Sequence, residues 1–234
     1  MARNVSAIVS GLGFGCGFLT ALDKERQKLG VSDEDFHAAI KEESPLIKKF
    51  ADLIAESCKP KLLELVGTID IPVTTERFVA KDRFVLDTSA SAKVKISYLG
   101  DNFKAKFLEK IEEPFSGSTL CASRLRESSL DAPIIAELGG EEKSETTLAE
   151  IFSLMEKQPS GEQGKLLTNG YANIFYVRDA KGVLCAVYVR WSEDGWSVFA
   201  FSISFPFRWF GGRQIFSRNS FVLEPSETLV PAQA

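Results

Sequence analysis

Hydrophobic and polar positions alternate in strand-length blocks between residues 173 and 205, and this pattern predicts a β-sheet. The blocks 173–178, 183–191 and 196–205 are rich in β-branched and aromatic residues, which suit a pleated, half-buried surface. The separators 179–182 and 192–195 are four-residue turn blocks that each end in glycine, which readily adopts the left-handed conformation of a hairpin return. The pattern therefore predicts a three-stranded antiparallel meander.

Two loops of four residues would place Arg178 opposite Val183 and Trp191 opposite Trp196. Because side chains alternate between the two faces of a sheet, this register divides the meander into two faces. The more uniformly apolar face, which we expect to pack on helices, has Arg190 at its edge and carries Phe175, Val177, Leu184, Ala186, Tyr188, Phe199, Phe201 and Ile203. The other face is mixed in character and carries Ile174, Tyr176, Arg178, Val183, Cys185, Val187, Val189, Trp191, Trp196, Val198 and Ala200.

Aromatic and basic side chains accompany the mixed face and continue beyond it through residues 208–218. Aromatic rings and guanidinium groups suit unstacked bases, and glycans and protein partners use the same residue types. The sequence therefore predicts a binding surface made of seven residues: Tyr176, Arg178, Trp191, Trp196, Arg208, Trp209 and Arg213. The alternative is that the two opposed indoles cap a core. Residues 214–217 would add a short edge strand.

Helical spacing of apolar residues dominates the N-terminal part of the chain. A first predicted helix ends at Gly30, and Ser32 caps a second helix whose first turn is acidic. A third predicted helix starts at Pro45 and is broken by Pro60. These elements predict a helical layer that ends near Val66.

The stretch 5–22 contains no charged residue and includes four glycines. A secretory signal would need a compact leucine-rich run, and a membrane span would need fewer small and polar residues. A phosphate-binding loop is disfavoured because Cys16 stands at the third glycine position and no Lys-Ser or Lys-Thr pair follows. A buried glycine-rich helix, or the segment leading into it, is the interpretation that we favour.

Shorter elements are predicted between the helical region and the meander. The clearest helix follows Thr147, which forms a capping box with Glu150, and the acidic run 141–145 before it is predicted as a solvated loop. Residues 132–138 fit either a strand or a helix. The other predicted elements are a helix at 101–111 and strands at 69–73, 77–84, 93–99 and 119–126.

Together these patterns predict an α+β protein, in which an N-terminal helical layer packs on a C-terminal antiparallel β-meander and short central strands are added. The expected regions are helical at 1–67, mixed at 68–160, an antiparallel sheet at 161–223 and a loose tail at 224–234. The 234 residues would form one or two compact units.

Charge is unevenly distributed along the chain. The net charge of −4 argues against a dedicated nucleic-acid binder, but residues 165–223 hold seven Lys and Arg against three Asp and Glu. This local excess of positive charge would steer a polyanion toward the C-terminal part. The hydrophobic share of 44% and the charged share of 26% are those of an ordinary soluble globular protein, and we expect a cytoplasmic location.

Few residues suited to catalysis or metal binding are present. The four cysteines, Cys16, Cys58, Cys121 and Cys185, are far apart, which predicts free thiols and neither a disulfide framework nor a zinc site. The single histidine, His37, disfavours mechanisms that pair a nucleophile with histidine. We therefore predict a non-enzymatic binding module without a cofactor. The alternative is a carboxylate-based, glycosidase-like hydrolase, because acidic pairs recur along the chain.

Several segments between about residue 70 and residue 220 resemble a family of uncharacterised proteins from small-genome candidate-phylum bacteria. The similar segments are DTS (87–89), VKISYLGDNF (94–103), DAPIIAELG (131–139), GYANIFYVRD (170–179) and FSRN (216–219). The resemblance implies a bacterial and cytoplasmic source. It implies no activity, cofactor or partner, so no functional residue is carried over from it.

Overall fold

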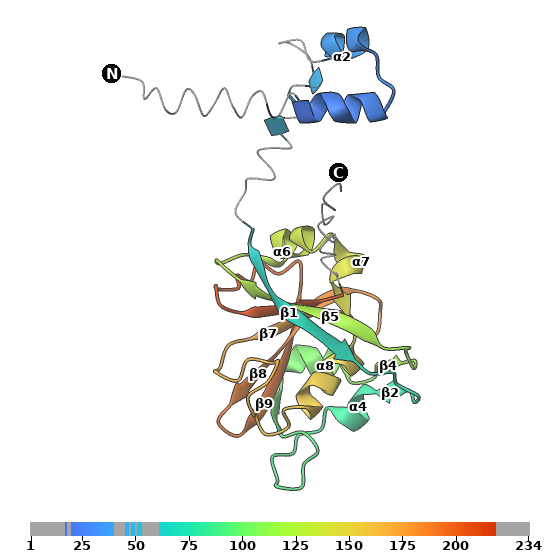
Figure 1. Ribbon diagram of the computed structural model, residues 1–234. Helices are drawn as coiled ribbons and strands as arrows, with labels where there is room; N and C mark the ends of the chain where they lie inside the picture. Colours follow the sequence, from blue (N-terminus) through green and yellow to red (C-terminus); the bar gives the residue numbers. More distant parts are fainter. Residues whose placement is uncertain are drawn as a thin grey trace, which may run out of the picture. The chain divides into compact units, whose positions relative to one another are not determined.

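The computed structural model describes residues 17, 20–39, 45, 46, 48, 49, 51, 52 and 61–218 (Figure 1). The chain divides into two compact units, Met1–Pro60 and Lys61–Ala234. Among the described residues, no helix is both long enough and apolar enough to cross a membrane. The predicted tail after residue 223, most of the glycine-rich stretch 5–22, Cys16 and Cys58 lie outside the described residues.

The described part of the N-terminal unit is mainly helical, as the sequence predicts. Its helical residues 20–28 stop before Gly30, which has a left-handed φ of 67°. The next helix, α2 (Asp33–Ala39), is capped by Ser32, whose Oγ accepts a hydrogen bond from the Asp35 backbone N–H at 3.1 Å. The expectation that this unit packs on the sheet stays a prediction.

The second unit is built on a mixed sheet of eight strands, in the spatial order β1-β5-β10-β7-β8-β9-β3, with β6 also paired to β7. Figure 1 shows β1 and β5 crossing the direction of β8 and β9, as in a strongly twisted sheet. The strands are β1 (Leu63–Ile71), β3 (Ile96–Leu99), β5 (Ser118–Leu125), β6 (Glu145–Thr146), β7 (Asn173–Arg178), β8 (Leu184–Ser192), β9 (Gly195–Ser202) and β10 (Gln214–Ser217). A separate pair joins β2 (Phe78–Val79) to β4 (Ile111–Glu112).

The predicted meander is present, because β7, β8 and β9 are consecutive antiparallel neighbours. The sheet as a whole is mixed, since β10 and β6 pair with β7 in parallel and β3 pairs with β9 in parallel. The prediction of an edge strand at 214–217 is wrong, because β10 lies between β5 and β7. Ile215 and Phe216 are fully buried in different cores on the two faces of the sheet, which an edge position would not require.

The register of the first hairpin differs from the predicted one by a single residue. Trp191 opposes Trp196 as predicted, but Arg178 opposes Leu184 instead of Val183. The Asp179 backbone N–H donates to the Val183 carbonyl at 2.9 Å, so these two residues close a three-residue loop that ends in Gly182 with φ 81°. This loop length is common in hairpins whose last loop residue is left-handed.

A shift of one residue moves every β7 side chain to the opposite face of the sheet. Phe175 and Val177 therefore share a core with the β8 and β9 residues of the predicted mixed face, Cys185, Val187, Val189, Trp196, Val198 and Ala200. Ile174 and Tyr176 instead lie with Leu184, Ala186, Tyr188 and Phe201. The prediction for β8 and β9 is therefore met only in part. Leu184 and Ala186 of the predicted apolar face share a core with residues of α6, but the residues of the predicted mixed face are also buried in a core that includes helix residues.

Helices cover the two faces unequally. The core that contains Trp196 includes residues of α4 (Ala80–Arg83), α5 (Asp101–Phe107) and α8 (Leu148–Glu156). The core on the opposite face includes residues of α6 (Asp131–Glu137), and it continues into partly buried aromatic residues. We call these the helix-covered face and the open face of the sheet.

The middle of the chain follows the predictions in part. The predicted strand at 77–84 consists of β2 and α4, and the ambiguous segment 132–138 lies almost entirely in the helix α6. The predicted loop at 141–145 holds the short helix α7 (Glu141–Ser144) and the start of β6. Strand β1 begins at Leu63, before the predicted end of the helical region.

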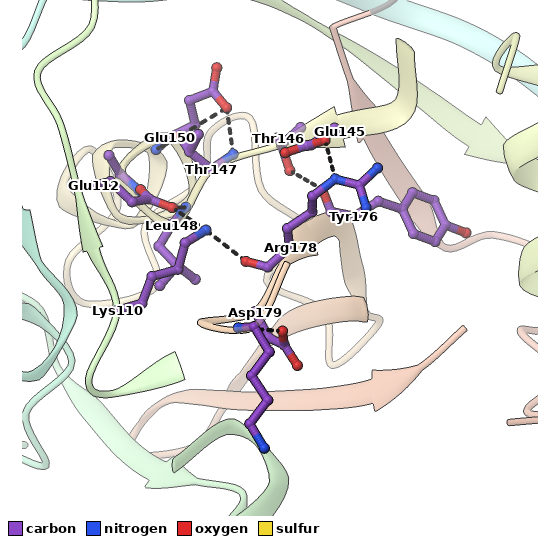
Figure 2. Close-up of polar contacts among 12 residues, drawn as sticks. Lys110, Glu112, Glu145, Thr146, Thr147, Leu148, Glu150, Tyr176, Arg178 and Asp179 are labelled. Carbon is purple, nitrogen blue, oxygen red and sulfur yellow. Dashed lines mark hydrogen bonds and ion pairs between the residues drawn. The ribbon is translucent and has the colours of Figure 1, made fainter. Parts of the chain in front are cut away.

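Helix α8 is anchored at its N-terminus by two glutamates. Thr147 and Glu150 form the predicted capping box, in which each side chain accepts the backbone N–H of the other residue. The carboxylate of Glu112, from β4, accepts the N–H groups of Leu148 at 3.1 Å and Ala149 at 2.9 Å (Figure 2). Lys110 pairs with Glu112 at 2.9 Å and donates to the Arg178 carbonyl at 2.7 Å, which links α8 to the end of β7.

We expect Glu112→Gln to lower the free energy of unfolding by about 1–3 kcal/mol, because an amide nitrogen cannot accept one of the two helix N–H groups and the charge that faces Lys110 is lost. The measurement is urea denaturation followed by circular dichroism. The neighbouring exposed pair Glu113 and Arg77 provides the control, since Glu113→Gln should change stability by less than about 0.5 kcal/mol. Equal effects of the two substitutions would contradict this role of Glu112.

The Asp179 carboxylate supports the hairpin register, because one of its oxygens accepts the Lys181 and Val183 N–H groups at 2.9 Å each. We expect Asp179→Ala to lower the free energy of unfolding by about 1–2 kcal/mol. Asp179→Asn keeps an acceptor oxygen and should cost less than half as much. Urea denaturation measures the stability of both variants. An Asn variant as unstable as the Ala variant would contradict the stabilising role of the two hydrogen bonds that the Asp179 carboxylate accepts.

Candidate ligand-binding face

The seven residues predicted as a binding surface do not share one face. Tyr176 and Trp196 are both 0% exposed, belong to cores on opposite sides of the sheet, and have buried hydrogen-bond partners. Trp209 is 3% exposed. Trp191 is half-buried and meets Trp196 edge-on, with ring centroids 5.4 Å apart. The structure therefore corrects the prediction of one solvent-facing platform and supports the alternative that the indoles belong to the core.

Arg178 is committed to structural contacts. Its guanidinium group donates to Glu145 at 2.9 Å (Figure 2). It also donates to Glu141 at 3.1 Å, and these two bonds raise the pKa of Arg178. Both glutamates come from the segment α7–β6 beside β7. Of the predicted set, the structure brings together Arg208, Trp209 and Arg213, which line one pocket.

A row of aromatic rings lies on the open face of the sheet. Ring centroids are 5.2 Å apart between Tyr98 and Phe199, 4.8 Å between Phe199 and Tyr188, and 5.8 Å between Tyr188 and Phe201. The row, which we call the aromatic face, consists of Tyr98, Tyr188, Phe199, Phe201, Phe205 and Phe207. Tyr98 is 45% exposed, Phe205 is 55% exposed, and the others are half-buried. The aromatic face thus offers ring surface to a ligand.

A pocket of about 130 Å³ adjoins the aromatic face. The described residues that line it include four aromatic residues and three arginines but no Asp or Glu. We call it the arginine pocket; it is lined by Gly170, Ala172, Tyr188, Arg190, Phe207, Arg208, Trp209, Phe210 and Arg213. A second pocket of about 430 Å³ shares Gly170 and Arg190 with it and is otherwise lined by Ser97, Trp191, Ser192, Glu193 and Asp194.

Aromatic rings and carbonyls, not carboxylates, hold the three arginines. The Arg190 Cζ lies 5.4 Å from the centre of the Phe199 ring, and the Arg213 Cζ lies 4.8 Å and 5.1 Å from the centres of the Tyr171 and Phe210 rings. Arg208 donates to the Ser128 carbonyl at 3.2 Å. Within the described part of the chain, none of the three has a carboxylate at ion-pair distance. Their positive charge is therefore available to a ligand.

A buried carboxylate fixes the wall of the arginine pocket. Asp131, at the start of α6, is 2% exposed, and its Oδ1 accepts the Trp209 indole N–H at 2.8 Å and the Tyr176 hydroxyl at 2.9 Å. Burial raises the pKa of the Asp131 carboxyl, although the two donated bonds oppose that shift. The indole also meets the rings of Tyr188 and Phe207 edge-on. Trp209 is thus tied to the core on one side while it lines the pocket on the other.

The alternative of a carboxylate-based hydrolase has less support in the geometry. From the predicted acidic pairs, Glu112 is held by the N-terminus of α8 and Glu141 by Arg178. His37 is exposed in α2. No group of three or more His, Cys, Asp or Glu side chains in the described residues could hold a metal ion. Cys121 and Cys185 are free and buried, in agreement with the prediction of free thiols for these two.

Sequence reasoning missed most of the aromatic face, although a signal was present. Residues 199–210 contain five phenylalanines and a tryptophan within twelve positions, interrupted by Pro206. A single strand cannot bury all of these rings on one side. Strand β9 ends at Ser202, and the aromatic residues continue into the segment that follows it. Tyr98 could not have been assigned from the sequence, since β3 reaches β9 only through tertiary pairing.

We expect Asp131→Asn to become more stable relative to the wild type as pH rises from about 4 to 7. A carboxyl whose pKa is raised on folding from its usual 3.8 stabilises the fold most at low pH, and it loses that contribution as pH rises through its folded pKa. Thermal denaturation across this pH range measures the difference. A stability difference between Asp131→Asn and the wild type that stays constant across this pH range would contradict the assignment.

Comparisons with known proteins found no match: no family model, no curated protein and no solved structure matches the chain.

Proposed function

We propose that the chain is a non-catalytic binding module whose open sheet face binds single-stranded nucleic acid. One observation supports the proposal: three arginines that have no carboxylate partner among the described residues lie beside a row of partly exposed aromatic rings. Bases stack on aromatic side chains with about 1–3 kcal/mol each, and guanidinium groups bind the phosphates between them. A flat row of rings on a sheet is a common platform for unstacked bases.

The charge distribution supports this ligand class. The whole chain is negative, with a net charge of −4, but the arginine pocket concentrates positive charge beside the aromatic face, with which it shares Tyr188 and Phe207. A neutral glycan would use the rings but would leave the three guanidinium groups without an anionic partner. A protein partner would have to supply carboxylates at the same three positions, so charge alone favours a polyanion.

The test is fluorescence anisotropy with labelled twelve-nucleotide single strands of DNA and RNA at low and physiological salt. We expect Tyr98→Ala and Phe205→Ala each to weaken binding by about 5-fold to 150-fold, because each removes one stacking surface. Both side chains are substantially exposed, so the fold should tolerate their loss. Engagement of three phosphates by the three arginines predicts a slope of about −2 for log K against log salt.

Leu86→Ala is the matched control, because Leu86 is 55% exposed and does not belong to the aromatic face. Its affinity should equal that of the wild type. Absence of strand binding, together with binding of a neutral glycan that depends on Tyr98, would overturn the proposal in favour of a sugar ligand. Self-association of the chain that Phe205→Ala abolishes would instead identify a protein interface.

A further inference from the structure

The arginine pocket is chemically different from the rest of the open face. The aromatic face presents rings in a row, whereas the pocket encloses a small space among three guanidinium groups. A phosphodiester inside a strand carries one negative charge, but a terminal phosphomonoester carries about −1.5 to −2 at pH 7. A site with three arginines and no carboxylate among its lining residues is matched best to the more highly charged group.

The neighbouring pocket differs from the arginine pocket in charge. The two pockets share Gly170 and Arg190 among their lining residues. The second pocket is otherwise lined by Ser97, Trp191 and Ser192 and by the acidic residues Glu193 and Asp194. Negative charge in that pocket repels phosphate.

Two of the guanidinium groups of the arginine pocket are held in place before a ligand binds. Arg213 lies against the Tyr171 and Phe210 rings, and Arg190 lies against Phe199. Trp209, which forms part of the wall, is fixed through its bond to Asp131. A site that is ordered in advance loses less conformational entropy when it binds.

We propose that the arginine pocket binds a terminal phosphomonoester, so that the module prefers strand ends that carry a phosphate. The inference rests on the proposed function, because the strand attached to that phosphate would run along the aromatic face, away from Glu193 and Asp194. The same chemistry is offered by a 5′-phosphate, a 3′-phosphate or a free nucleoside monophosphate, and the experiment below separates these sources.

The test compares three fluorescent eight-nucleotide strands of one sequence, with a 5′-phosphate, a 3′-phosphate or hydroxyl groups at both ends, by anisotropy at pH 7.5. A label inside the strand leaves both ends free. We expect at least 10-fold tighter binding of one phosphorylated strand. Unlabelled nucleoside 5′-monophosphate and 3′-monophosphate serve as competitors and should show the same order of preference.

Arg208→Gln and Arg213→Gln should reduce the preference for the phosphorylated end to less than 3-fold, while the hydroxyl-ended strand still binds. Arg124→Gln is the control, because it removes the same charge from an exposed position on β5 outside the arginine pocket, and it should keep the full preference. Lowering the pH to 5.5 should also weaken the preference, because a phosphomonoester loses its second charge near pH 6 whereas arginine stays charged.

The outcomes separate this inference from the proposed function. Equal binding of all three strands would overturn the terminal-phosphate inference and leave strand binding intact. Binding of a free nucleoside monophosphate without binding of any strand would support the chemistry of the pocket and overturn the proposed function. A preference that is unchanged between pH 7.5 and pH 5.5 would contradict recognition of the second phosphate charge.

Discussion

The hydrogen bonds within the β7–β8 hairpin determine which face of the sheet each β7 residue occupies, and the rest of the second unit depends on that choice. Asp179 and Val183 close a three-residue loop, and the Asp179 carboxylate binds two further N–H groups inside it. Phe175 and Val177 are thereby directed toward the helix-covered face with Val187 and Trp196, while Tyr176 is directed toward α6. A loop longer by one residue would exchange these positions and place a phenol in the wrong core.

The two faces of the sheet have different roles because the helices are distributed unequally. Helix α8 carries buried apolar residues along nearly its whole length, and Glu112 and the capping box satisfy the N–H groups at its start. The buried carboxylate of Glu150 is in turn paired with Arg218, just after β10. The helix-covered face therefore forms the larger core, and the row of partly exposed rings lies on the opposite face.

The candidate site is joined to the core through Asp131 and Trp209. The carboxylate that fixes the indole also receives the Tyr176 hydroxyl from the middle of β7, so one buried acceptor connects the pocket wall to the central strand. The aromatic and basic character of this part of the chain could be predicted from composition, and Arg208, Trp209 and Arg213 do line one pocket. The choice of Tyr176 and Trp196 as surface residues failed for two reasons: β7 pairs with β8 one residue away from the predicted register, and helices cover the face of the sheet that carries Trp196.

The sequence by itself determined the features that arise from contacts between residues close along the chain. These include the capping box at Thr147, the helix end at Gly30, the three strands of the meander and the Trp191–Trp196 pair, since a few neighbouring residues decide each of them. Only the tertiary structure decided that β10 lies inside the sheet, that β3 adds Tyr98 to the aromatic face, and which face the helices cover. Those outcomes depend on pairing between segments far apart in the sequence, where local propensity carries no information about the partner.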